Sequence, residues 1–335
     1  MRAAVLLALL SLCACNAHGP VEVELFGDTM GTQFSVKLAV SDIDVNADRL
    51  QQEIEGSLAE VEQMMSTFVP DSEISRFNDN LTTEWQEASE EFCSSVEKAQ
   101  VLSMLTGGAF DITVGPLVNL WGFGPGEIID EPPADESVSA ILQLVGYNHL
   151  QTDCSRPALR KNIAELVLDM SAFGKGYAVD RIADWLDVAG FDDYLVEVGG
   201  ELRLGGHNAS GQMWAIGIET PVADQRRPHT VIRLTDTAVA TSGDYRNYFE
   251  ADGERYSHTI DTRTGRPVTH SLASVTVIDD KGYRADALAT ALLVMGPEKG
   301  MELARREDLA VLFLLRRESG IDERSTPAFE QLRST

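Results

Sequence analysis

Segments with helical spacing and segments with strand-like spacing alternate irregularly along this chain, and this order constrains the fold more than any other feature. Residues 45–66 carry apolar side chains at every third or fourth position, which predicts an amphipathic helix. Residues 194–198 and 201–205 are short runs rich in Val and Leu, bounded by glycines, which is typical of strands. An irregular mixture of helices and mostly antiparallel strands predicts an α+β protein.

The other expected elements follow the same rules of spacing and punctuation. Further helices are expected at 88–106, at 171–190 after a short loop, at 284–295, and in a helix–strand pair at 297–315. Further strands are expected at 165–169, 213–218, 230–234, 238–241 and 272–279, with hairpins turning around Gly27-Asp28 and Asp252-Gly253.

The chain begins MRAAVLLALLSLCAC, a single arginine followed by an apolar run. The run is shorter than the roughly 20 residues that span a bilayer, so it predicts a secretory signal peptide. Its end, LCAC, resembles a bacterial lipobox, so we expect a signal peptide at 1–14, a lipidated Cys15 and a tether at 15–21. The protein would then be exported, on the periplasmic side, and held to a bacterial membrane by this lipid alone. The alternative is an ordinary signal peptide that ends near Ala14 or Ala17.

The 335 residues carry a formal net charge of -26 at pH 7. This charge argues against nucleic acid as a partner, because phosphate backbones require surfaces rich in Lys and Arg. It also argues against docking of the folded surface on anionic lipid. Any anionic ligand would therefore need a local positive feature or a bound metal ion.

Cys13 lies in the signal segment and Cys15 would carry the lipid, so Cys93 and Cys154 remain. An exported compartment permits a disulfide between them. Their spacing does not decide whether they pair, so both states stay open. The chain has no C-x-x-C motif and no Cys/His cluster, which argues against a zinc site.

The stretch ADALATALLVMG (285–296) reads as a buried helix that carries two polar side chains on one face. Asp286 and Thr290 are four residues apart, so their oxygens converge about one turn apart. Mg²⁺ prefers such oxygens, and it leaves positions for water and substrate phosphates. The alternative is that Asp286 caps the helix and that Thr290 bonds the carbonyl one turn earlier.

Two further stretches contain candidate residues. SAFGKGYAVD (171–180) places glycines at the start of a helix, where free N–H groups and the helix dipole attract anions. Small residues that let helices pack closely would explain these glycines equally well. YSHTIDTRTGRPV (256–268) contains His258, which could accept a proton from a hydroxyl at neutral pH. A structural histidine is the alternative there.

Seven motifs follow one another along the chain: MGT (30–32), MSTFVPDSEISRFN (65–78), GAFDITVGPL (108–117), LDMSAFGKGYAVD (168–180), VEVGGELRLGG (196–206), YSHTIDTRTGRPV (256–268) and ADALATALLVMG (285–296). In this order they resemble the ApbE family of FAD:protein FMN transferases. The resemblance extends over residues 22–315. It implies one catalytic domain at 22–320 followed by a polar tail at 321–335.

The resemblance implies a fold, a reaction and partners. The fold is α+β of the T-fold-like kind, with mixed, mostly antiparallel sheets and packed helices. Members of the family bind FAD and Mg²⁺, transfer FMN from FAD to a Thr or Ser hydroxyl of an acceptor protein, and release AMP. Acceptors are typically subunits of membrane redox complexes, such as sodium-pumping NADH:quinone oxidoreductase or the Rnf complex.

Site residues carry over from the family motif by motif. The residues that would contact FAD are Met30, Phe68, Ala109, Phe110, Asp111, Ser171, Tyr177 and Ile260. The residues that would bind the metal are Asp286 and Thr290, with backbone oxygens of Gly174 and Ala289. Asp286, through the metal, and His258, as an aid to deprotonation of the acceptor hydroxyl, are the expected catalytic residues.

This chain departs from the family pattern at two of these positions. Gly174 stands where the family often has Ala, a change that keeps the backbone carbonyl. Phe68 stands where Tyr is commoner, which keeps a ring surface and loses a hydroxyl contact. Two other functions remain open, because the residues that hold FAD would look the same: an FAD pyrophosphatase that makes FMN and AMP, and a module that binds FAD without catalysis.

Overall fold

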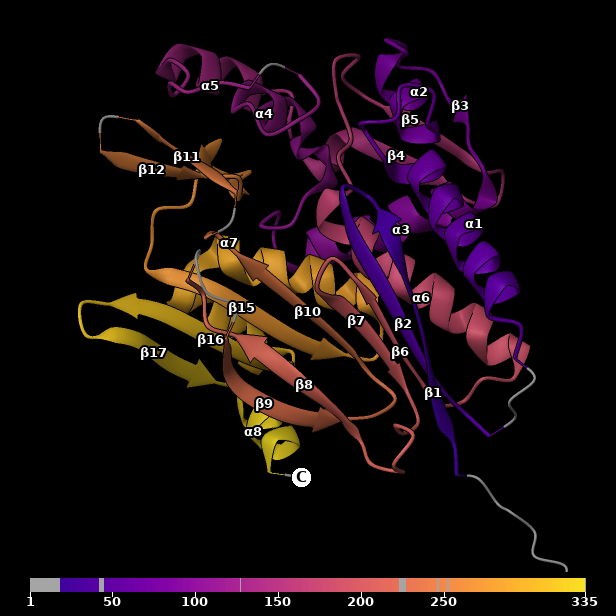
Figure 1. Ribbon diagram of the computed structural model, residues 1–335. Helices are drawn as coiled ribbons and strands as arrows, with labels where there is room; N and C mark the ends of the chain where they lie inside the picture. The colour runs from indigo at the N-terminus through magenta and orange to yellow at the C-terminus, as the bar shows by residue number, and fades with distance from the viewer. Residues whose placement is uncertain are drawn as a thin grey trace, which may run out of the picture.

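The computed structural model describes residues 19–41, 45–126, 128–222, 227–245, 247–251 and 253–334. Its centre is an eight-stranded sheet (Figure 1) in which each neighbouring pair is antiparallel. In sheet order the strands are β1 (Val21–Thr29), β2 (Thr32–Val40), β6 (Tyr194–Val198), β7 (Glu201–Gly205), β10 (Ala238–Gly243), β15 (Leu272–Asp279), β16 (Ala310–Arg317) and β17 (Gly320–Ser325). The expected α+β class is confirmed.

Helices cover one face of this sheet, and the two long helices α6 and α7 lie side by side against its central strands (Figure 1). The helices and the sheet together bury most of the apolar side chains of the molecule. The helices are α1 (Ala47–Met65), α2 (Glu73–Asp79), α3 (Glu90–Leu105), α4 (Gly115–Leu120), α5 (Asp135–Leu142), α6 (Ser171–Ala189), α7 (Gly282–Arg306) and α8 (Pro327–Arg333), with short 3-10 turns η1 (Ile112–Val114) and η2 (Tyr147–His149).

The other face of the sheet is covered by a hairpin and by α8. The hairpin strands β8 (Trp214–Glu219) and β9 (Pro228–Leu234) bury alternate side chains in a second core that includes Trp214 and Phe329. Because both faces are covered, β15 is apolar without alternation, as its sequence LASVTVID indicates.

A third and smaller core lies beside the sheet. Trp121 and Ile260 are buried there between α4, α5 and the strands that follow β10. The remaining strands are β3 (Gln86–Glu87), β4 (Leu150–Asp153), β5 (Ala158–Lys161), β11 (Tyr248–Ala251), β12 (Glu254–Ser257), β13 (Ile260–Asp261) and β14 (Arg266–Pro267). β11 and β12 form the hairpin expected near residue 252, although Asp252 itself lies outside the described residues.

The first hairpin does not turn around Gly27-Asp28, so that prediction is wrong. β1 and β2 are joined by Met30 and Gly31, which have φ of 48° and 67°, and Thr29 pairs with Thr32. Two positive φ angles are the signature of a two-residue hairpin turn. Gly27 lies inside the strand opposite Phe34, where a Cβ would come within 2.6 Å of the Phe34 ring.

The expected strand at 165–169 is also wrong. Leu166 and Leu168 are buried, but the segment pairs with no strand among the described residues. Instead, the side chain of Asn78 replaces a neighbouring strand: its Nδ2 donates to the Leu168 carbonyl at 2.9 Å, and its Oδ1 accepts from the Leu168 N–H at 2.7 Å. This amide satisfies the backbone of Leu168, while the Asp169 N–H donates to the Ile112 carbonyl and the Lys161 Nζ donates to the Leu166 carbonyl.

The C-terminal residues complete the fold instead of forming the expected polar tail. The two helices expected at 284–295 and after 297 are one element, α7, which breaks at Gly296 with φ 77° and continues through Pro297. Beyond β16, β17 forms an edge of the sheet and α8 buries Phe329 completely. The segment is polar in sequence because only one of its faces is buried.

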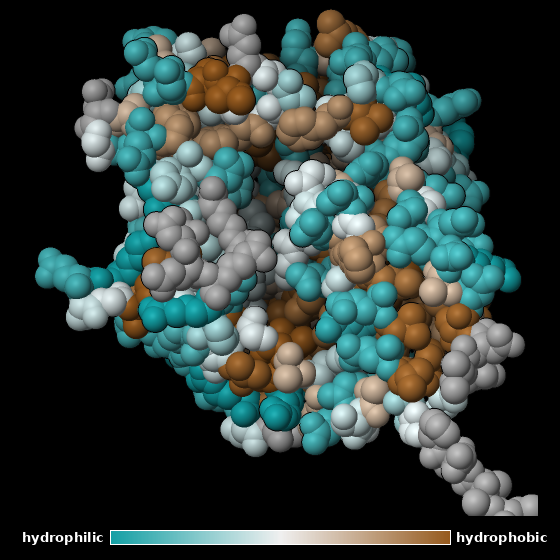
Figure 2. Space-filling model, in the orientation of Figure 1, coloured by the Kyte–Doolittle hydropathy of each residue, from teal (hydrophilic) through white to brown (hydrophobic). Residues whose placement is uncertain are grey.

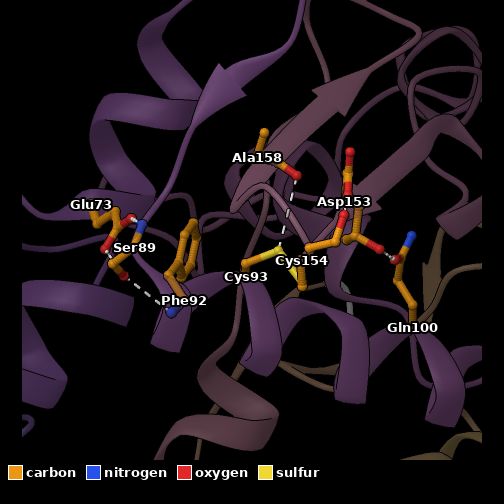
Figure 3. The surroundings of a disulfide bond; sticks show 10 residues. Glu73, Ser89, Phe92, Cys93, Gln100, Asp153, Cys154 and Ala158 are labelled. Carbon is orange, nitrogen blue, oxygen red and sulfur yellow. Dashed lines mark hydrogen bonds between the residues drawn. A yellow bond between two sulfur atoms is a disulfide. The ribbon is translucent and has the colours of Figure 1, made fainter.

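A disulfide joins Cys93 of α3 to Cys154, which follows β4 (Figure 3). The sequence left this pairing open. Cys93 is fully buried and packs with Phe92 and Ala158 around it, so the bond ties α3 to the small sheet of β3, β4 and β5.

None of the helices among the described residues combines the length and the apolar character that a membrane span requires. The predicted signal peptide, the lipidated Cys15 and most of the tether lie outside the described residues.

Candidate active site

A cavity of about 390 Å³ lies where the end of β10 meets the first half of α7 and the start of α6. The face of the molecule drawn in Figure 2 is hollowed near its centre, below a band of apolar side chains. Eight residues expected from the sequence line the cavity although they come from four separate segments: Ala109, Phe110, Asp111, Ser171, His258, Ile260, Asp286 and Thr290.

Two glycines bring α6 and α7 into close contact beneath the cavity. A Cβ on Gly176 would lie 2.2 Å from the carbonyl oxygen of Gly282, and a Cβ on Gly282 would lie 2.5 Å from that of Gly176. Gly176 also donates its N–H to Oδ2 of Asp286 at 3.0 Å. Close helix packing therefore explains this glycine of the SAFGKGYAVD motif, and it positions the Asp286 carboxylate.

Asp286 does not cap its helix. α7 begins at Gly282, and the N–H groups of Gly282 and Tyr283 donate to the carboxylate of Asp180 on α6, at 2.8 and 3.0 Å. Asp286 lies one turn further along, is 2% exposed and borders the cavity. Its partner Thr290 borders the cavity too, and the Thr290 Oγ1 lies 2.7 Å from the Ser242 Oγ. The two oxygen groups thus share one face, as their spacing predicts.

The start of α6 leaves helical geometry at Ala172, where φ is -89° and ψ is 21°. The Gly176 N–H, one turn further on, donates to Asp286. Ala172 lines the cavity, whereas Gly174 does not. Ala172 and Asp286 are therefore both part of the cavity wall.

A buried glutamate and a lysine, neither of them expected as site residues, also line the cavity. Glu201 at the start of β7 is 4% exposed, and its Oε1 lies 3.0 Å from the Lys175 Nζ. The same Nζ lies 3.9 Å from Oδ2 of Asp286. Sequence reasoning missed this trio because α6, β7 and α7 supply one member each. The only trace in the sequence is a glutamate placed directly after two glycines.

Burial governs the protonation of these groups. It raises the pKa of Glu201 to about 7, opposed by the nearby Lys175 ammonium, and it raises the pKa of Asp286 above its usual range. Burial alone would lower the pKa of Lys175, but the charges of Asp286 and Glu201 outweigh it and raise that pKa. The Lys175 ammonium is therefore the positive charge that lies near both carboxylates, those of Glu201 and Asp286.

His258 follows β12 and also lines the cavity. Its Nδ1 lies 3.0 Å from the Asn247 carbonyl oxygen, which can only accept a hydrogen bond, so Nδ1 carries the proton. The lone pair of the neutral ring is then on Nε2. Desolvation lowers the pKa of His258 below its usual value, so the ring is neutral at pH 7. A neutral imidazole with a free Nε2 can accept a proton.

The Asp111 carboxylate is held by the backbone around it. It accepts from the Thr113 N–H at 2.9 Å, from the Thr113 hydroxyl at 2.7 Å and from the Tyr147 N–H at 2.7 Å. Burial raises the pKa of Asp111 despite these bonds. The carboxylate thus shapes the loop that carries Ala109 and Phe110 to the cavity.

Three residues predicted to contact flavin lie outside the cavity lining. Tyr177 of α6 turns its hydroxyl to Glu91 and stacks on Phe173. Met30 lies in the turn between β1 and β2, and Phe68 follows α1 with 66% of its surface exposed. Their contact with flavin stays a prediction.

Of the two backbone groups predicted to bind metal, neither lines the cavity. Ala289 is fully buried within α7, and Gly174 is partly buried on α6. Their roles also stay predictions, and the residues of this part of α6 that line the cavity are Ser171, Ala172 and Lys175.

The donor set fits a magnesium ion that is completed by a ligand. No three His, Cys, Asp or Glu side chains among the described residues are grouped as a protein-only metal site would require. A single carboxylate with a hydroxyl nearby is the incomplete oxygen set that Mg²⁺ accepts when water and phosphates supply the rest.

Known proteins are similar to this chain in both sequence and fold. The model of the ApbE family matches residues 30–313. The FAD:protein FMN transferase of Vibrio cholerae is 44% identical over 97% of this chain and 96% of its own length, and that of Haemophilus influenzae is 40% identical over 97% and 95%. The solved flavin transferase ApbE from Vibrio cholerae superposes with a TM-score of 0.87 at 43% identity, covering 93% of this chain and 99% of that one. The chain belongs to the ApbE family.

Proposed function

We propose that this protein is an FAD:protein FMN transferase that moves FMN from FAD to a Thr or Ser hydroxyl of an acceptor protein. The activity itself is supported by relatives of that name at 40–44% identity over nearly the whole chain. The observation that carries the proposal is the cavity, whose lining brings together Asp286, Thr290 and His258 from distant parts of the chain. Asp286 and Thr290 can hold a phosphate-binding metal, and His258 can accept a proton.

The metal proposed here is Mg²⁺. Asp286 and Thr290 would supply a carboxylate and a hydroxyl, with backbone oxygens of Gly174 and Ala289 as the family pattern implies. When bound, the ion supplies charge neutralisation for the diphosphate of FAD. The chain carries a net charge of -26 and would otherwise repel an anionic substrate, so a bound cation is needed to offset that repulsion.

The reaction exchanges one P–O bond for another. The oxygen of the acceptor hydroxyl bonds to the phosphorus on the FMN side of the diphosphate, and the bond from that phosphorus to the bridging oxygen breaks. AMP leaves with the bridging oxygen, and the hydroxyl proton passes to Nε2 of His258. Ala109, Phe110 and Ile260 present apolar surface to the flavin part of the substrate and exclude water from it.

Mass spectrometry of an acceptor tests the function directly. An acceptor fragment containing one Thr, incubated with the protein, FAD and Mg²⁺, is expected to gain the mass of one FMN residue, and AMP should form in equal amount. Omitting Mg²⁺ should abolish the gain. Formation of FMN and AMP with no change in acceptor mass would instead identify the pyrophosphatase, in which water replaces the hydroxyl. Retention of intact FAD would identify a binding module.

His258→Ala is expected to lower the transfer rate by about 10²-fold, near 3 kcal/mol, because a positioned proton acceptor is lost. In the unaltered protein the active form is the neutral ring. Since burial lowers the pKa of His258, the rate should stay on its plateau at pH 7 and fall only below about pH 6.5. Stopped-time assays from pH 5 to 8 measure both effects. An unchanged rate with intact FAD binding would remove His258 from the mechanism.

We also propose the location and the partners. The lipobox-like LCAC end of the leader favours acylation of Cys15 and a periplasmic position on a bacterial membrane. The Cys93–Cys154 disulfide supports an oxidising compartment, where such bonds persist. A lipid-held enzyme on that side would meet periplasmic segments of membrane redox complexes, of the sodium-pumping NADH:quinone oxidoreductase or Rnf kind.

A further inference from the structure

The pairing of Lys175 with two buried carboxylates is left unexplained by the proposed reaction. Glu201 is almost as buried as Asp286, and its Oε2 has no hydrogen-bond partner among the described residues. Its Oε1 lies 3.0 Å from the ammonium of Lys175, and that ammonium lies 3.9 Å from Oδ2 of Asp286. Buried charges of like sign are tolerated only where an opposite charge lies among them.

Two glycines allow the side chain of Lys175 to reach the two carboxylates. Gly199 and Gly200 have φ of 59° and 105°, and they turn the chain sharply between β6 and β7 so that Glu201 faces the cavity. A Cβ on Gly199 would lie 3.1 Å from Cδ of Lys175 and 2.8 Å from Cγ2 of Thr32. The missing side chain therefore leaves the passage through which the stem of Lys175 reaches the two carboxylates.

We infer that Lys175 is a positioning residue that acts as a built-in counter-cation of the metal site. With all three groups ionised, the trio carries a net charge of -1, from two carboxylates and one ammonium. In the absence of metal the ammonium keeps Glu201 and Asp286 close together and in place. It also opposes a divalent ion at Asp286, so it sets the concentration at which that ion binds. This inference rests on the metal site of the proposed function.

The test is thermal unfolding with and without Mg²⁺ at pH 8, on the unaltered protein and on Lys175→Met. Without metal, the variant is expected to melt about 5 °C or more below the unaltered protein, because two buried carboxylates lose their counter-charge. Mg²⁺ should restore most of that loss. The Mg²⁺ concentration that gives half of the effect should be at least about tenfold lower in the variant, since the repelling ammonium is gone.

A second substitution separates charge from packing. Adding Glu201→Gln to Lys175→Met removes the uncompensated carboxylate, so the double variant should regain at least half of the lost melting temperature without metal. A lysine that only filled space would not be rescued in this way. If Lys175→Met alone does not fold, folding of the double variant supports the inference, and failure of both overturns it.

Asp286→Asn distinguishes the two proposals. If Mg²⁺ raises the melting temperature of the unaltered protein and not that of Asp286→Asn, the metal site stands. Lys175→Met with unaltered stability, or with an unaltered Mg²⁺ midpoint, then overturns the counter-cation alone. If Mg²⁺ affects neither the unaltered protein nor Lys175→Met, the metal site fails and the inference fails with it.

Discussion

Asp286→Asn is expected to lower Mg²⁺-dependent transfer of FMN by about 10³-fold or more, equivalent to about 4 kcal/mol of lost transition-state stabilisation. Asparagine keeps the shape of the side chain and an oxygen that can accept from the Gly176 N–H, at 3.0 Å in this structure. It removes the negative charge that would hold the metal against the diphosphate. Initial rates measured over a range of Mg²⁺ concentrations would report the loss.

Asp180→Asn is the matched control. Asp180 is a second buried carboxylate within the contact of α6 and α7, and it bonds two backbone N–H groups at the start of α7. It does not line the cavity. This variant should be less stable, yet the Mg²⁺ concentration for half-maximal rate should not change. Equal metal dependence in the unaltered protein and in Asp286→Asn would refute the role given to Asp286.

The elements best predicted from the sequence are those whose ends are marked by local chemistry. The strands at 194–198, 201–205 and 272–279 were placed correctly, since glycines or polar residues bound each apolar run. Errors arose where a distant residue completes the structure. Gly27 was read as a turn because nothing nearby reveals that Phe34 lies across it. The segment at 165–169 has the apolar residues of a strand, but its backbone bonds to Asn78, Ile112 and Lys161 in place of a partner strand.

The site also contains some residues that the sequence predicts and others that it does not. Helical spacing alone places Asp286 and Thr290 on one face, and the structure has that face on the cavity. Glu201 and Lys175 are brought together by the packing of α6 against β7, which no spacing in the sequence encodes.

Replacing both Cys93 and Cys154 by alanine is expected to lower the free energy of unfolding by about 4 kcal/mol, because the bond closes a loop of 61 residues whose entropy rises in the unfolded chain when it is cut. The bond joins α3 to β4, so the first part to loosen should be the small sheet of β3, β4 and β5. Urea unfolding followed by tryptophan fluorescence would measure the loss, since Trp85 borders that sheet.

A reductant distinguishes the stability that comes from the disulfide bond from the stability that comes from packing of the two cysteine side chains. Dithiothreitol should shift the urea midpoint of the unaltered protein towards that of the double variant, and it should leave the midpoint of the variant unchanged.

Neither cysteine lines the cavity, so the variant without denaturant should transfer FMN within about twofold of the usual rate, as expected for changes remote from the reacting groups. An unshifted midpoint in the variant would mean that packing of α3 carries the stability here attributed to the disulfide. A large loss of activity in the folded variant would mean that the bond, through the α3–η1 connection, holds Ala109 and Phe110 at the cavity wall.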